Sequence, residues 1–247
     1  MKPRHLLPWL APLACTLSLG AEEPPPPAVP PSPAPCVVKI DDSRFRIGEV
    51  ELNRKTRTIR FPVAVNMSEG ALEFAVVHEN GKVHESLFLT KINPSHLNIA
   101  FKLLRYQASE ELFPLMDEGH PTGFFPQVDA KTRAAARVTV RVLWQDGSEE
   151  KSATLNEWIS NARTAEPMPP GPWVYSGSLI VQGQFIAEAT GDLIAIFTSR
   201  AAVLNFPGED SDNDDAWIPR TAHIPAKGTA VTVEISPWKS TTQQPPP

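Results

Sequence analysis

The residue types best suited to chemistry are two histidines and a glutamate, His78, His84 and Glu85, which lie within a short stretch of sequence. Imidazole and carboxylate groups together can bind zinc or transfer protons. The spacing of His78, His84 and His96 matches no compact zinc motif, however, so neither a metal site nor a cofactor is predicted. We expect His78, Glu85 and His84 to be ligand-binding residues, and no residue is predicted to be catalytic.

A turn between these residues decides which of their side chains meet. Asn80-Gly81 separates two apolar alternating segments and is the dipeptide most typical of a two-residue β-hairpin. Side chains alternate between the faces of such a hairpin, which places His78 and Glu85 diagonally on one apolar face and His84 on the other. Glu85 is then either a polar anchor in a ligand pocket or a structural carboxylate bonded to His78 or to backbone amides. A register shift of one residue would exchange the two faces.

Two further groups of residues have a chemical interpretation that the sequence does not favour. Residues 210–215 place oxygen ligands at alternate positions as calcium loops do, but Asp215 stands where such a loop needs glycine and Thr221 where it needs glutamate. This segment is therefore predicted to be a solvated acidic loop. Four tryptophans could form a carbohydrate platform but are predicted to lie in the core: Trp144, Trp158, Trp173 and Trp217.

Residues 1–21 have the pattern of a signal peptide. A short basic segment precedes an apolar stretch, residues 6–19, which is shorter than the roughly 20 residues that span a bilayer. Small residues near position 21 allow cleavage. We expect a periplasmic or secreted protein; the alternative is lipid anchoring through Cys15, although a lipobox usually has leucine where Pro12 stands.

Residues 22–36 are predicted to form a proline-rich linker, because the many prolines there restrict φ and remove amide donors. After cleavage Cys36 would be the only cysteine, so an intramolecular disulfide is excluded. The folded domain is expected to span residues 37–237, and residues 238–247 are expected to be a disordered tail.

The charge of the chain limits its partners. The formal net charge is −5, from 28 acidic and 23 basic residues, and the basic residues form no cluster. Nucleic acids and anionic membranes bind through clustered lysine and arginine, so neither is expected as a partner. No apolar stretch after the signal peptide is long enough to be an integral membrane segment. The expected partner is an envelope protein or a small ligand.

The elements that must position these residues show both strand and helix patterns. Asn93-Pro94 predicts a helix start ahead of apolar residues at helical spacing, and residues 155–159 predict a helical turn. Residues 106–131 are irregular and are expected to form a long surface excursion. A short helix is predicted at 199–204. The predicted strands are 72–78, 83–90, 137–144, 173–181, 184–189, 192–197 and 230–235.

These elements predict an α+β fold, mainly an antiparallel sheet with a few short helices. Hairpin, helix and a Val-Thr-Val strand occur in this order twice, over residues 72–144 and 173–236. The order suggests two related β-β-α-β halves.

Short motifs spread over residues 61–237 carry a resemblance to a known family. They are Gly81-Lys82 with His84-Glu85-Ser86, Pro94-Ser95-His96-Leu97, Glu157-Trp158-Ile159, Trp173-Val174 with Gly177-Ser178, Asn205-Phe206-Pro207, Ile224-Pro225, and Gly228-Thr229 with Val231-Thr232. Together they resemble the YdjY-domain family. The resemblance implies an exported bacterial protein but no activity, since the family has none established. Residues 106–131 depart from the family pattern and resemble an insertion.

The expected function is that of a binding or scaffolding module outside the cytoplasm, in the bacterial cell envelope, held away from its anchor or partner by the linker. The alternative is a metal-assisted envelope hydrolase that uses His78 and Glu85 in a cleft. No catalytic motif in the sequence favours the hydrolase.

Overall fold

The computed structural model describes residues 37–239. The expected signal peptide, the proline-rich linker, Cys15, Cys36 and most of the expected tail lie outside these residues. Within them, no helix has both the length and the apolar character needed to cross a membrane.

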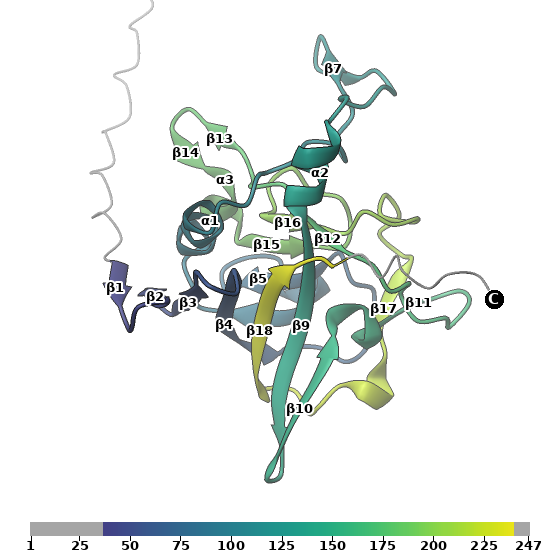
Figure 1. The fold of residues 1–247 in the computed structure, drawn as a ribbon. Coiled ribbons are helices and arrows are strands. Elements are labelled where there is room, and N and C mark those ends of the chain that lie inside the picture. The colour runs from purple at the N-terminus through teal and green to yellow at the C-terminus, as the bar shows by residue number, and fades with distance from the viewer. Residues whose placement is uncertain (1–36, 240–247) are drawn as a thin grey trace, which may run out of the picture. The chain divides into compact units, whose positions relative to one another are not determined.

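The centre of the domain is a closed β-barrel of eight strands (Figure 1). The barrel closes because the last strand in the order, β6, pairs with the first, β4, at Ala64–Leu89 and Val65–Phe88. In order around the barrel the strands are β4 (Thr58–Val65), β18 (Ala230–Pro237), β9 (Arg137–Asp146), β12 (Trp173–Tyr175), β16 (Leu204–Asn205), β15 (Asp192–Ala195), β5 (Phe74–His78) and β6 (Ser86–Thr90).

The predicted α+β class is therefore wrong. Strands make up 38% of the structure and helices 16%, and the main sheet is closed rather than open. The physical reason is that closure depends on pairing between β4 and β6, which are joined by no short turn. Local sequence patterns carry no signal for such a contact.

Alternation along the longest strands fills the barrel interior. In β18, Val231, Val233 and Ile235 are buried while their neighbours are more exposed, and β4 and β9 show the same period of two. Every second side chain of a barrel strand points inward, so these apolar residues form the core. The predicted strands 137–144 and 230–235 are confirmed, and they pair with each other in antiparallel register.

The expected hairpin around Asn80-Gly81 does not form. β5 and β6 pair in parallel, with Phe74 opposite Ser86 and His78 opposite Thr90. Residues 79–85 instead carry the chain back over the barrel and end in a 3-10 turn, η1 (Val83–Glu85). Neither turn residue has the positive φ that a type I′ turn requires. The amide of Glu79 donates to the carbonyl of Thr90, so long-range pairing overrides the local turn preference.

A second parallel pair, β15 and β16, is joined in the same way by residues 196–203. We call residues 79–85 and 196–203 the two crossovers. A buried polar side chain holds each one. Asn66 donates to the carbonyls of Val83 (2.6 Å) and Ser86 (2.8 Å). Ser176 donates to those of Ala202 (3.1 Å) and Val203 (3.2 Å). The short helix predicted at 199–204 is wrong, because this segment is a crossover that ends in β16.

The barrel strands form two sets of four with the same pairing pattern. When β4 is exchanged with β12, β5 with β15, β6 with β16 and β9 with β18, every pair of neighbouring strands becomes another pair of neighbouring strands. The exchange turns one parallel pair into the other, and it keeps the antiparallel pairs β5–β15 and β9–β18. The repeating unit is thus four strands with a crossover, not the expected hairpin, helix and strand. The sets are β4, β5, β6, β9 and β12, β15, β16, β18.

Several local predictions are confirmed. Helix α1 (Pro94–Leu103) begins at Asn93, whose side chain accepts a hydrogen bond from the amide of Ser95 at 2.7 Å. The helical turn η2 (Leu155–Trp158) forms where it was predicted. The predicted strands 173–181 and 184–189 form only in part: β12 and β13 (Ile180–Val181) take the place of the first, and β14 (Gln184–Phe185) is followed by helix α3 (Ile186–Thr190). The turn at Gln182-Gly183 has positive φ at both residues and joins β13 to β14.

The remaining elements extend from the barrel. The predicted surface excursion contains the hairpin β7–β8, and a helix, α2, follows it and leads into β9 (Figure 1). The additional elements are β1 (Val37–Lys39), β2 (Arg44–Ile47), β3 (Val50–Asn53), β7 (Met116–Asp117), β8 (His120–Pro121), α2 (Ala130–Ala136), β10 (Glu149–Thr154), β11 (Ile159–Asn161), α3 (Ile186–Thr190), β17 (Trp217–Pro219) and η3 (Thr221–His223).

Candidate functional site

The three predicted site residues lie at the first crossover but not in the predicted arrangement. His78 ends β5, and its Nδ1 accepts a hydrogen bond from the amide of Asn80 at 3.2 Å. His84 is exposed, and its Nε2 lies 3.3 Å from Oε1 of Glu85. The structure therefore brings His84 and Glu85 together, whereas the hairpin had placed them on opposite faces. The apolar face shared by His78 and Glu85 does not exist, because there is no hairpin.

A buried carboxylate beside this crossover was missed by the sequence reasoning. Asp192, the first residue of β15, is 5% exposed. Its Oδ2 accepts a hydrogen bond from Ser199 at 3.3 Å, while Oδ1 has no partner within the described part of the chain. Burial raises the pKa of Asp192, and the positive charge of Lys82 opposes that rise. Asp192 belongs to no motif, and only the fold buries it.

Lys82 connects Asp192 to the predicted residues. Its Nζ donates to Oε2 of Glu73 at 2.8 Å, and this hydrogen bond raises the pKa of Lys82, with further contributions from Glu85 and Asp192. Four charged groups and Ser199 thus gather between the two crossovers, and we call them the crossover cluster: Glu73, Lys82, Glu85, Asp192 and Ser199. No three His, Cys, Asp or Glu side chains among residues 37–239 are grouped so that they could hold a metal ion.

A recess whose lining gives it a chemical character of its own lies elsewhere, beside β11 and β17. Two loops, residues 161–172 and 206–210, enclose about 620 Å³ together with Trp217. We call it the Pro-walled groove, since five prolines line it: Pro167, Pro169, Pro170, Pro172 and Pro207.

Local hydrogen bonds shape the first of these loops. The side chain of Asn161 accepts from the amides of Arg163 (3.0 Å) and Thr164 (3.2 Å), which turns the chain back on itself. Further along, Asn156 donates to the carbonyl of Pro169 at 2.8 Å and ties the proline segment to η2. Proline fixes φ, so the five prolines restrict the conformations that the wall can adopt before any ligand arrives.

In the second loop, the backbone at Gly208 passes very close to the ring of Phe206. A Cβ on Gly208 would collide with the ring of Phe206, so only glycine allows the ring to lie beneath this loop. Phe206 meets Trp217 edge to face, with ring centroids 5.4 Å apart and an interplanar angle of 81°. Phe206 and Pro207 belong to a motif that carried the family resemblance, so a characteristic part of the sequence builds this groove.

Trp217 has an unusual environment for a buried indole. It is 4% exposed, and its Nε1–H has no acceptor among residues 37–239. Trp173 is buried too, but its Nε1 donates to Oδ1 of Asn156 at 3.0 Å. Buried donors are normally paired, so an unpaired one beside a groove is informative.

The burial predicted for Trp158, Trp173 and Trp217 is confirmed, while Trp144 is only partly buried.

Charges at the rim of the groove are mostly acidic. Glu166 and Glu209 are exposed, and Asp210 accepts a hydrogen bond from Nδ2 of Asn161 at 3.2 Å; Arg163 supplies the opposing charge. Asp210 opens the acidic segment predicted at 210–215, and its carboxylate is turned toward the first loop.

Comparison with known proteins identifies one similarity. The family model of the YdjY domain matches residues 50–236, which covers all eight barrel strands, except the last residue of β18, and the Pro-walled groove. No curated protein and no solved structure matches the chain significantly.

Proposed function

The chain belongs to the YdjY-domain family, and we propose that its domain is a binding module outside the cytoplasm that holds an extended peptide segment of an envelope protein. The ligand would occupy the Pro-walled groove. This proposal keeps the partner class expected from the sequence but moves the site away from His78, His84 and Glu85.

The observation that carries the proposal is the unpaired, buried indole N–H of Trp217, a residue that lines the groove. A buried donor without an acceptor destabilises a protein by about 1–3 kcal/mol. A ligand carbonyl that reached this N–H would remove that penalty. Peptide backbones present carbonyl acceptors at regular intervals, so an extended peptide can place one at Trp217.

The proline wall supports the same class of ligand. Prolines offer carbonyl oxygens and flat apolar surface but no amide donors. An extended peptide complements such a wall with its own N–H groups and apolar side chains. Because the wall is already rigid, little conformational entropy is lost when a ligand binds.

Rim charge indicates one feature of the peptide. Glu166, Glu209 and Asp210 outnumber Arg163, so the groove favours a segment that carries a lysine or arginine. A solvent-exposed ion pair adds only about 0.2–1 kcal/mol, so this charge selects among peptides rather than providing most of the affinity.

Binding of lysine-containing extended peptides to the purified protein tests the proposal. Fluorescence anisotropy with a synthetic peptide library should identify a binder whose dissociation constant rises about tenfold in Trp217→Phe, as loss of one hydrogen bond predicts. Trp144→Phe, which lies outside the groove, is the matched control and should bind like the parent protein. Equal affinity of Trp217→Phe and the parent protein would contradict the assignment of the groove.

Export is part of the same proposal and rests on residues 1–21. Mass spectrometry of the protein recovered from bacterial envelope fractions tests it. A chain that begins near residue 21 or 22 supports a free exported protein, and an acylated Cys15 supports a tethered one. Recovery of the intact chain from the cytoplasm would argue against both.

A further inference from the structure

Exposed apolar side chains are concentrated at one end of the domain. Of the eleven large hydrophobic residues that are exposed in the described chain, three lie near β1, namely Val37, Val38 and Ile40. The other eight belong to the excursion around β7–β8, the β13–β14 hairpin and the end of α1. We call them the apolar pole: Leu103, Leu115, Met116, Phe124, Phe125, Leu179, Ile180 and Val181.

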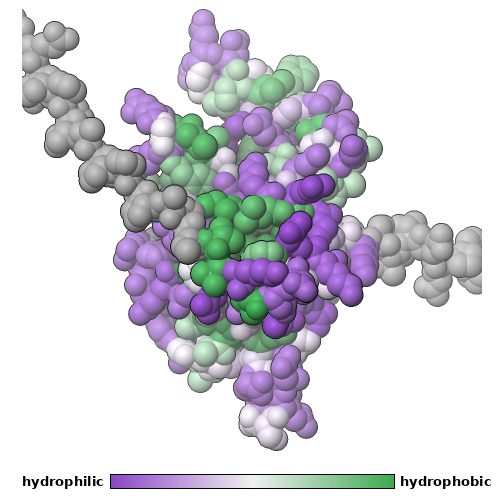
Figure 2. Space-filling view, turned by 60° about the vertical axis from the view of Figure 1, so that its left-hand side comes forward, coloured by the Kyte–Doolittle hydropathy of each residue, from purple (hydrophilic) through white to green (hydrophobic). Residues whose placement is uncertain are grey.

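The elements of the apolar pole lie together. Figure 1 shows the β7 excursion and the β13–β14 hairpin at the same upper end of the molecule, and the upper end of Figure 2 shows hydrophobic surface scattered among hydrophilic surface. At their bases, the amide of Ser109 donates to the carbonyl of Tyr175 at 3.0 Å. Tyr175 in turn stacks on Phe101 of α1, with ring centroids 4.2 Å apart. These contacts join the bases of the elements, so the exposed residues lie at the same end of the domain.

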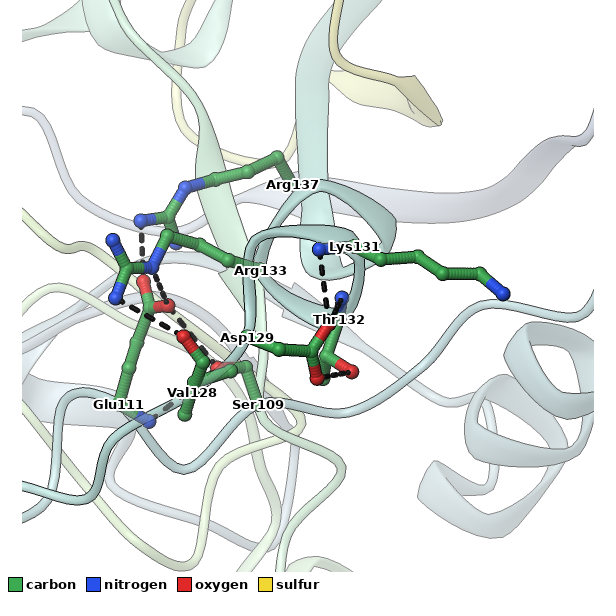
Figure 3. A network of polar contacts seen from close by, with 8 residues as sticks. All are labelled: Ser109, Glu111, Val128, Asp129, Lys131, Thr132, Arg133 and Arg137. Atoms are coloured by element: carbon green, nitrogen blue, oxygen red, sulfur yellow. Dashed lines mark hydrogen bonds and ion pairs between the residues drawn. The ribbon is translucent and has the colours of Figure 1, made fainter.

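Polar contacts hold the excursion in place, so its apolar residues are presented by ordered backbone. Figure 3 shows Glu111 between Arg133 and Arg137, and Nε of Arg133 lies 3.1 Å from Oε2 of the Glu111 carboxylate. Arg200 of the second crossover donates to the carbonyl of Pro114 at 2.7 Å. Such fixing reduces the entropy lost when a partner covers the surface.

Charges of both signs flank the apolar pole. Asp117 and Glu118 are exposed on the β7–β8 turn, whereas Lys102 and Arg105 are exposed at the end of α1. None of the four takes part in an ion pair within residues 37–239. A surface that carries apolar residues together with unpaired acids and bases can complement itself.

We propose that the apolar pole binds a second copy of this chain in a two-fold dimer. Such an interface uses the same patch on both subunits, so each contact occurs twice. The acidic β7–β8 turn of one copy would face the basic end of α1 of the other, and the apolar side chains would be buried between them. A lipid surface is a poorer occupant, because Asp117 and Glu118 lie on the protruding turn and would be driven into the membrane first.

Sedimentation velocity on the purified protein, over roughly 1 to 100 μM, tests the dimer. We expect a reversible dimer that is weakened at least tenfold in Phe124→Ser/Ile180→Ser. Val38→Ser, in the other exposed apolar group, is the control and should dimerise like the parent protein. Circular dichroism confirms that each variant is folded.

A charge exchange makes the test specific to this pairing. Asp117→Lys/Glu118→Lys should weaken the dimer, and adding Lys102→Glu/Arg105→Glu to the same chain should restore it. The proposal is overturned if the parent protein stays monomeric over this range, or if the dimer forms equally well in the first charge variant. It is also overturned if the monomer binds zwitterionic vesicles through Phe124 and Ile180. Peptide binding in the Pro-walled groove is independent of each of these outcomes.

Discussion

Asp192 shows how the surroundings of one residue create a property that its type does not predict. An exposed aspartate ionises easily, but this one is buried between the crossovers with one oxygen unpaired. Lys82 provides a nearby positive charge, while Glu73 adds a negative one that raises the pKa further. The net effect of burial and neighbours is a raised pKa, so folding shifts the equilibrium of this carboxyl toward its protonated form.

The sign of this shift gives a testable pH dependence. A carboxyl whose pKa is raised on folding contributes most to stability below its unfolded pKa, near 3.8, and loses that contribution as the pH rises through the folded pKa. Asp192→Asn cannot ionise. We therefore expect it to melt a few degrees above the parent protein at pH 7, since 1 kcal/mol corresponds to about 2–4 °C in a domain of this size.

Thermal melts of both proteins from pH 3 to pH 7 provide the measurement, and the difference in Tm should shrink toward the acidic end. Asp214→Asn, at an exposed acid, is the control and should follow the parent protein throughout. A variant that melts below the parent protein at pH 7, with a deficit that shrinks toward pH 3, would show that Asp192 is stabilised as the anion by Lys82.

At the scale of elements, two glycines explain why the first crossover departs from a hairpin. Gly81 and Gly191 face each other where β5 ends and β15 begins. A Cβ on Gly191 would lie 3.0 Å from Cα of Gly81, and one on Gly81 would lie 2.9 Å from the carbonyl oxygen of Thr190. Gly81 is thus needed for close backbone approach rather than for a turn of positive φ. The dipeptide Asn80-Gly81 gives no means of distinguishing these two uses.

Gly191 and Gly183 form a matched pair that isolates this close approach. Both have φ of +80°, but nothing lies within 4 Å of a Cβ built on Gly183. Substitution by alanine imposes the left-handed backbone penalty of about 1–2 kcal/mol at either position. At Gly191 the contact with Gly81 adds to it, so Gly191→Ala should lower the free energy of unfolding by at least 1 kcal/mol more than Gly183→Ala.

Urea denaturation of the two variants measures the difference. An equal decrease in the free energy of unfolding in both variants would mean that only the backbone conformation matters at Gly191. The end of β5 and the start of β15 could then move apart without a loss of stability.

At the scale of the whole molecule, the barrel is unevenly closed. β18 pairs with β4 and with β9 over six residue pairs each, whereas β4 and β6 share two. The short strands β12, β15 and β16 likewise make few pairs with their neighbours. The barrel therefore has a strong side around β18 and weak seams of two residue pairs each, among them the closing seam between β4 and β6.

Native-state hydrogen exchange should follow this division. Amides of β9 and β18 are expected to exchange only by global unfolding, while those of β6 at the seam exchange by local opening with a smaller free energy. Exchange measured by NMR at increasing denaturant separates the two classes. Protection of β6 equal to that of β18 would show that the barrel opens only as a unit.

The groove and the apolar pole are separate surfaces of the same domain. One is made by loops next to β11 and β17, and the other by the excursion, the β13–β14 hairpin and α1. A dimer formed through the pole would therefore leave the groove of each copy free for a peptide. Two linked grooves would increase the effective affinity for a partner that carries two such segments.

The sequence alone determined the elements whose causes are local. The Asn93 cap and the following proline start α1, and alternation of apolar residues defines β9 and β18, because these signals act between residues close in the chain. The motifs were also sufficient to identify the family. Tertiary structure alone decided the parallel pairing of β5 with β6, the closure of the barrel, the burial of Asp192 and the unpaired indole of Trp217. Each of these depends on contacts between residues far apart in sequence, whose pairing is selected by the packing of the whole core and not by any local preference.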